Sequence, residues 1–155
     1  MLKAQTLPLS HHKRLQRFIE LEKGENAMKK KIIMLCMALI TLVLEILPYG
    51  AVCNFANPDG ASFRFTYSYF DLTPFGYANF SPFIVAILTC ILIVMIVISL
   101  ITKKQMLKPI LAISAISTML SMAPLLFGIR YFSIIGAFIT ITLAINTFIA
   151  VPNKK

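Results

Sequence analysis

The stretch FIVAILTCILIVMIVISLIT, residues 83–102, contains no charged side chain. A helix of about 20 apolar residues is long enough to cross the hydrocarbon core of a bilayer. Three further segments of similar length and composition lie on either side of it: Ile32–Val52, Pro109–Phe127 and Tyr131–Val151. The sequence therefore predicts an all-α membrane protein, built as a bundle of four transmembrane helices at residues 32–52, 83–102, 109–127 and 131–151.

The composition agrees with this class. Hydrophobic residues make up 58% of the chain, whereas soluble domains contain roughly 45–50%. The three cysteines, Cys36, Cys53 and Cys90, are scattered, and no two of them have the spacing of a redox or zinc motif. We expect them to be free thiols that behave as small apolar residues, and we expect no metal and no cofactor.

Lysine and arginine are distributed very unevenly around the four segments. Thirteen of the 15 lie in residues 1–31, 103–108 and 152–155, and the other two are Arg64 and Arg130. Because positively charged connections remain in the cytoplasm, both termini and the loop 103–108 are predicted to be cytoplasmic, and the loop 53–82 extracytoplasmic. We therefore expect a multi-pass protein of the cytoplasmic (plasma) membrane. The net charge of +9 then serves topology and contact with anionic headgroups, and we expect no nucleic acid partner.

Residues 1–27 differ from the rest, and two interpretations stay open. In the first, Ser10 caps a basic amphipathic helix on the inner leaflet, with Leu15, Phe18 and Ile19 on one face and an end near Gly24. In the second, the segment is a start-site artefact, because three lysines and an apolar run follow Met28 as in the opening of many bacterial membrane proteins.

Glu45 is the only acidic residue within the four segments. An ionisable group at membrane depth costs about 2.5–3.5 kcal/mol on insertion scales, so it should face the bundle interior and have a partner. Arg130, just before the fourth segment, has a side chain that can reach inward. We therefore predict an intramembrane ion pair between Glu45 and Arg130. The alternatives are a neutral carboxyl or a proton or cation site.

Small and polar residues recur at helical spacing in three of the segments. Such stripes let helices pack closely, although a polar conduit would use the same residues, and the lack of charges along them favours packing. The one amide that argues for a conduit is Asn146. The stripes are Ala38, Thr41 and Glu45; Ser114, Ser117, Thr118 and Ser121; and Ser133, Ala137, Thr140, Ala144 and Thr147.

The loop 53–82 is unusually aromatic. Asn57-Pro58-Asp59-Gly60 is typical of a turn, and residues 63–69 (FRFTYSY) alternate aromatic and polar side chains, as in a half-buried strand. Since one strand is not stable alone, we expect it to pair within the loop as a short β-hairpin or to lie on the membrane. The aromatic residues either rest on the outer headgroups or form a recognition surface for a lipid, a glycan or a partner's segment. The candidate surface is Phe63, Phe65, Tyr67, Tyr69, Phe70, Asp71, Phe75, Tyr77 and Phe80.

Two runs, residues 45–58 (EILPYGAVCNFANP) and 69–80 (YFDLTPFGYANF), carry a resemblance. From about Met28 onward the chain resembles a group of small bacterial four-helix membrane proteins of unassigned function. The resemblance implies that Glu45 and residues 69–80 belong to a structural pattern common to this group, and it implies no substrate. Small multidrug-resistance transporters are similar in their glutamate in the first helix but have very short loops. Claudin-like proteins are similar in their first outer loop but carry tryptophan and paired cysteines there.

No catalytic motif stands out in the sequence. General acid–base chemistry needs at least two positioned groups, and Glu45 and Asp71 could pair only if the loop folds back. We therefore expect no catalytic residue and no enzyme. The predicted function is a structural or interaction component of the membrane, with the bilayer, a membrane protein or a second copy as partner. The alternative is a small proton-coupled transporter that uses Glu45.

Overall fold

The computed structural model describes residues 9–56, 60, 62–77 and 79–152, with side chains from residue 14 onward. Residues 57–59 of the predicted turn 57–60 and the lysines of the C-terminal tail lie outside this range. The helices are α1 Leu9–Ile46, α2 Thr73–Gly76, α3 Ser81–Ile101, α4 Leu107–Ser121 and α5 Ile134–Ala150, the 3₁₀ turns are η1 Ala123–Phe127 and η2 Ile129–Tyr131, and the strands are β1 Ala51–Phe55 and β2 Phe63–Tyr67.

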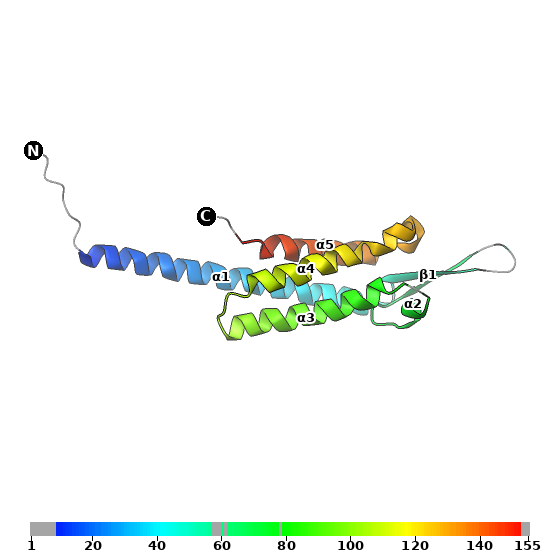
Figure 1. Cartoon of the computed structure of the whole chain (residues 1–155), viewed down its shortest axis with the longest axis horizontal. Helices are drawn as coiled ribbons and strands as arrows, with labels where there is room; N and C mark the ends of the chain where they lie inside the picture. Colours follow the sequence, from blue (N-terminus) through cyan, green and yellow to red (C-terminus); the bar gives the residue numbers. More distant parts are fainter. Residues whose placement is uncertain (1–8, 57–59, 61, 78, 153–155) are drawn as a thin grey trace, which may run out of the picture.

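Four of the helices pack side by side in a ring. α1 and α4 each contact both α3 and α5, while β1, β2 and α2 lie together at one end of the bundle (Figure 1). We call this the hairpin end, and the opposite end, which holds Lys30, Lys31, Lys103 and Lys104, the lysine end. Helices account for 73% of the structure, which confirms the prediction of a mostly helical protein with a small hairpin.

Two segments are long and apolar enough to cross a membrane: Ser81–Ile101, and Leu107–Phe127, which joins α4 to η1. Most of each is not packed against protein, since only 33% and 28% of their most apolar windows are buried. This differs from the core helix of a soluble protein, which hides most of its apolar surface. α5 is also apolar, but its 17 residues make it shorter.

α1 is one continuous helix of 38 residues that extends well beyond the bundle (Figure 1). The expected end near Gly24 is therefore wrong. A single exposed glycine costs a helix only about 1 kcal/mol, and nothing crowds Gly24. Leu15, Phe18 and Ile19 are all exposed on this extension.

Prolines shorten two of the predicted apolar segments. α1 ends at Ile46 and not near Val52, because the residue before Pro48 is disfavoured in the helical conformation. α4 ends at Ser121 and continues as η1. Pro124 has no N–H to offer the Leu120 carbonyl, and that carbonyl accepts a hydrogen bond of 2.8 Å from the Ser81 hydroxyl at the start of α3.

The two strands form an antiparallel hairpin in which Cys53 pairs with Phe65 and Phe55 with Phe63. The predicted strand therefore does pair within the loop. It is not half-buried, however, since Phe63 and Phe65 are each more than half exposed. Other loop aromatics pack on the same face of the sheet: Phe55 contacts Phe65 at a ring separation of 5.7 Å and Tyr77 at 4.8 Å.

The bundle interior contains buried polar groups that bond to one another. The Thr41 and Thr142 hydroxyls join α1 to α5 at 2.8 Å, and those of Ser114 and Thr147 join α4 to α5 at 2.6 Å. With its nitrogen toward α1, the Asn146 amide donates to the Met34 carbonyl (3.1 Å) and accepts from the Ala38 N–H (3.3 Å). These bonds are those of helix packing.

The stripe predicted for the fourth segment is partly wrong, because Ala144 is exposed. The buried positions of α5 are shifted by about one residue toward the N-terminus from the predicted stripe. It contains Gly136, Ile139, Thr142, Leu143, Asn146 and Ala150.

Candidate functional site

The Glu45 side chain lies in the last turn of α1 and is completely buried. Its Oε1 accepts a hydrogen bond of 2.7 Å from the hydroxyl of Thr89, a fully buried residue of α3. No described group hydrogen-bonds to Oε2. The carboxyl thus has one satisfied oxygen and one free oxygen, an arrangement that a proton or a small cation could complete.

The segment after the hairpin folds back over Glu45. The Tyr69 backbone N–H donates to the Glu45 carbonyl at 2.9 Å, and the Tyr69 side chain is only 2% exposed. Its ring lies against Gly50, where an added Cβ would stand 2.8 Å from the ring. Gly50 is therefore glycine because the aromatic ring comes too close for any side chain.

Ser133 and Gly136 attach α5 to the same place. The Ser133 hydroxyl donates to the Gly50 carbonyl at 2.6 Å and accepts from the Gly136 N–H at 2.8 Å, so it caps the start of α5. A Cβ at Gly136 would lie 3.4 Å from the Tyr69 hydroxyl oxygen. We call this set of residues the Glu45 site: Glu45, Gly50, Tyr69, Thr89, Ser133 and Gly136.

The Tyr69 hydroxyl belongs to this site as a neutral group. Burial, followed by the nearby Glu45 charge, raises the pKa of Tyr69 above its ordinary value. A phenol in such surroundings keeps its proton at physiological pH. Tyr69 thus acts as packing and as a polar cover, and not as a second titrating partner for the carboxyl.

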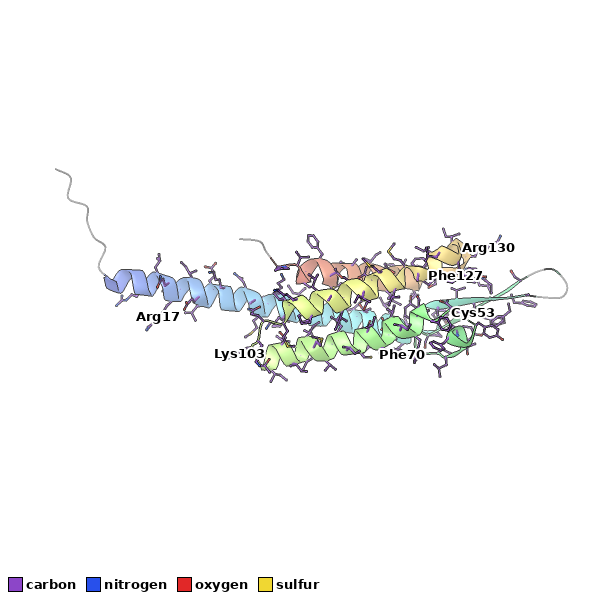
Figure 2. The ribbon with its side chains drawn as sticks, in the orientation of Figure 1. Arg17, Cys53, Phe70, Lys103, Phe127 and Arg130 are labelled. Atoms are coloured by element: carbon purple, nitrogen blue, oxygen red, sulfur yellow. The ribbon has the colours of Figure 1, made fainter. Side chains whose placement is uncertain are left out.

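Arg130 does not pair with Glu45, and the predicted ion pair is wrong. The carboxyl is turned toward Thr89 on α3, whereas Arg130 lies in η2, is exposed, and lines an open cavity together with Arg64. Figure 2 shows Arg130 at the hairpin end, opposite Lys103. Because Arg130 is exposed, its guanidinium stays hydrated, which costs less than desolvating it beside the carboxyl.

The candidate recognition surface separates into two parts. Tyr69 is buried in the Glu45 site and Tyr67 is partly covered. The other six aromatic residues are exposed, and Phe75 packs edge-on against Phe80 at 4.8 Å. These six, which we call the aromatic cap, are Phe63, Phe65, Phe70, Phe75, Tyr77 and Phe80.

Asp71 has a local structural role. Its Oδ1 accepts a hydrogen bond of 2.8 Å from the Thr73 N–H at the start of α2, and this bond holds the pKa of Asp71 below its ordinary value. Although the loop does fold back on α1, the structure does not bring the Asp71 and Glu45 carboxyls into a pair.

Sequence reasoning missed the two lysines that close helix ends. The Lys31 ammonium is almost fully buried and donates to the carbonyls of Ser99 and Lys104, each at 2.9 Å. Lys30 donates to the Val151 carbonyl at 2.9 Å. These lysines of α1 therefore cap the C-termini of α3 and α5, where unpaired carbonyls and the helix dipole favour a cation. The alignment of a basic segment with two helix C-termini could have indicated this.

The remaining ligand-type side chains do not gather. The three cysteines are free, as predicted, and within the described residues no group of three His, Cys, Asp or Glu side chains could hold a metal ion.

Comparison with known proteins does not assign the chain to a family. No family model matches the chain, and neither the curated proteins nor the solved structures contain a significant match.

Proposed function

We propose that this chain is a four-helix integral protein of the bacterial cytoplasmic membrane, with both termini in the cytoplasm. α3 is about 32 Å long at 1.5 Å per residue, α5 about 26 Å, and the apolar part of α1 about 22 Å. The 3₁₀ turns and the hairpin extend the shorter helices toward the hairpin end. A helix somewhat shorter than the hydrocarbon core is accommodated by local thinning of the bilayer and by lysine side chains that reach the interface.

The outward surface of the bundle supports this placement. Large apolar side chains cover the exposed side of every long helix, in positions where a soluble protein would place charges. They include Leu39, Ile40 and Val43 on α1, Ile87, Ile91 and Val94 on α3, Ile116 and Met119 on α4, and Phe138, Ile141 and Ile145 on α5.

Within the membrane, we propose a non-enzymatic interaction role for the aromatic cap. The observation that carries this proposal is that the cap is fixed in place and yet uncovered. Tyr69 anchors it to α1, and the Asn79 amide donates to the Val52 carbonyl at 3.5 Å, while Phe65 is 53% exposed and Tyr77 65%. A preformed aromatic surface loses little conformational entropy when a partner binds.

Photocross-linking in native membranes tests this role. A benzophenone amino acid replaces Phe65 in one variant and Phe138 in another. The two side chains are equally exposed, at 53% and 52%, but Phe138 lies on the membrane-facing side of α5. We expect a discrete protein adduct, either with a partner or with a second copy, at residue 65 and lipid adducts alone at residue 138. If both positions gave only lipid adducts, the aromatic cap would be a set of side chains that rest on the lipid headgroups, and the proposed interaction role would be wrong.

One observation favours a second function, a small proton-coupled transporter. The free Oε2 of Glu45, buried and close to α3, is where a transported proton would reside. In proteoliposomes with a pH gradient, a transporter would dissipate the gradient, Glu45→Gln would abolish this, and Glu25→Gln on the exposed α1 extension would not. Equal rates in all three proteins would eliminate this alternative.

A further inference from the structure

An open cavity of about 680 Å³ lies at the hairpin end, between the end of α1, β2 and the start of α5. Its walls are of two kinds. Arg64 and Arg130 supply positive charge, and Tyr49, Phe132, Ile129 and Ile134 supply apolar surface. None of these residues belongs to the Glu45 site or to the aromatic cap.

Among the described residues, the charged side chains that line the cavity are both positive and none is acidic. Asp71, an acidic side chain at the same end, is engaged by the Thr73 N–H. One Arg64 nitrogen, Nη2, donates to the Phe132 carbonyl at 3.4 Å. This bond orients the guanidinium, and no other described residue hydrogen-bonds to its remaining N–H groups. Two arginines that line one cavity, with no described acidic side chain beside them, are suited to a phosphate group, whose oxygens match the guanidinium fork.

The apolar walls restrict which phosphate compound fits. Ile129 is 82% exposed and Ile134 is 77% exposed, and both lie where the proposed membrane placement puts the outer boundary of the hydrocarbon core. A free phosphate ion would leave these side chains uncovered, whereas the acyl chains of a lipid would cover them.

We propose that this cavity binds the phosphate headgroup of an anionic phospholipid in the outer leaflet, with the acyl chains along the start of α5. This inference rests on the proposed membrane embedding. It gives the only two arginines outside the cytoplasmic segments a shared role: they hold a lipid against the junction of the hairpin with α5.

Native mass spectrometry of the full chain, released from detergent with dioleoyl phosphatidylglycerol or dioleoyl phosphatidylcholine, tests the proposal. We expect preferential retention of phosphatidylglycerol by the wild type. The double variant Arg64→Gln, Arg130→Gln should bind it about tenfold more weakly, since one charge-assisted hydrogen bond is worth about that factor. A matched control, Arg14→Gln with Arg17→Gln, removes the same charge from the α1 extension and should bind as the wild type does.

Three results would overturn the proposal: equal retention of the two lipids by the wild type, unchanged affinity in the cavity variant, or an equal loss in the control. Millimolar inorganic phosphate should leave lipid retention unchanged, and displacement of the lipid would identify the site as one for free phosphate. Flotation with phosphatidylcholine vesicles separates the two proposals. A chain that does not float contradicts the membrane embedding, whereas a chain that floats but shows any of these three results contradicts only the cavity inference.

Discussion

One methyl group at residue 50 would stand 2.8 Å from the Tyr69 ring, and this contact depends on residues that are 19 positions apart in the sequence. Glu45 could be recognised from the sequence as a buried carboxyl, because it is the only acid in an apolar segment. Its partner could not, since Thr89 is one of several small polar residues in the spans, and only the packing of α1 on α3 selects it. Reach alone predicts Arg130 as the partner, but reach does not show toward which helix the carboxyl turns.

The first prediction concerns Gly50. Gly50→Ala forces the added methyl into the Tyr69 ring and should lower the free energy of unfolding by about 1–3 kcal/mol, as overpacking does. The control is Gly24→Ala on the exposed part of α1, where nothing lies within 4 Å. It should be neutral or stabilise by up to about 1 kcal/mol, since alanine is the better helix former. Thermal unfolding in detergent measures both. Equal stability of the two variants would mean that Tyr69 does not lie on Gly50.

The second prediction separates the two proposed partners of Glu45. Thr89→Val removes the donor to Oε1 and should cost about 1–3 kcal/mol. In double-mutant cycles with Glu45→Gln, Thr89→Val should show a coupling of about 0.5–3 kcal/mol, whereas Arg130→Gln should be additive within about 0.5 kcal/mol. Strong coupling to Arg130 would restore the ion pair that the structure does not form.

At the scale of elements, the hairpin was predictable and the helix ends were less so. The alternation at residues 63–69 predicts a strand, and the turn-forming residues 57–60 make a hairpin one of its two possible arrangements, the other being a strand that lies on the membrane. The partner strand, Ala51–Phe55, begins within the last residues of the first predicted apolar segment, 32–52, which hydropathy alone assigns to a helix. Burial on α5 follows Gly136, Ile139, Leu143 and Asn146, a spacing that a search for small residues alone does not favour.

The third prediction tests the lysine cap of α3. Lys31→Met leaves the Ser99 carbonyl without the buried ammonium, so it should lower the free energy of unfolding by about 1–3 kcal/mol. Lys29→Met is the matched control, because that lysine forms an exposed ion pair with Glu25 at 2.8 Å, which is worth about 0.5 kcal/mol or less. If unfolding in detergent shifts equally in the two variants, Lys31 contributes only surface charge.

At the scale of the whole molecule, the uneven distribution of lysine and arginine in the sequence corresponds to the two ends of the helical bundle. Lys103 and Arg130 lie at opposite ends of the bundle (Figure 2), and Lys30 and Lys31 are fixed at the Lys103 end by their bonds to α3 and α5. Hydropathy predicts four spans. The structure shows two segments of full membrane length, which match the second and third predicted segments. The apolar part of the first ends with α1 at Ile46, and the fourth starts in the turn η2, so its helix has only 17 residues.

The most direct test of the four-span arrangement is cysteine accessibility at one position in each connection and near each end. In a variant without native cysteines, Arg17, Ser62, Gln105, Gly128 and Pro152 are changed to cysteine one at a time. Gly128 represents the connection between α4 and α5 because nothing lies within 4 Å of a Cβ added there. A membrane-impermeant maleimide is then applied to intact spheroplasts. We predict labelling at residues 62 and 128, and labelling at residues 17, 105 and 152 only after permeabilisation. Labelling of residue 105 in intact spheroplasts, or protection of residue 62 or 128, would contradict four spans with both termini in the cytoplasm.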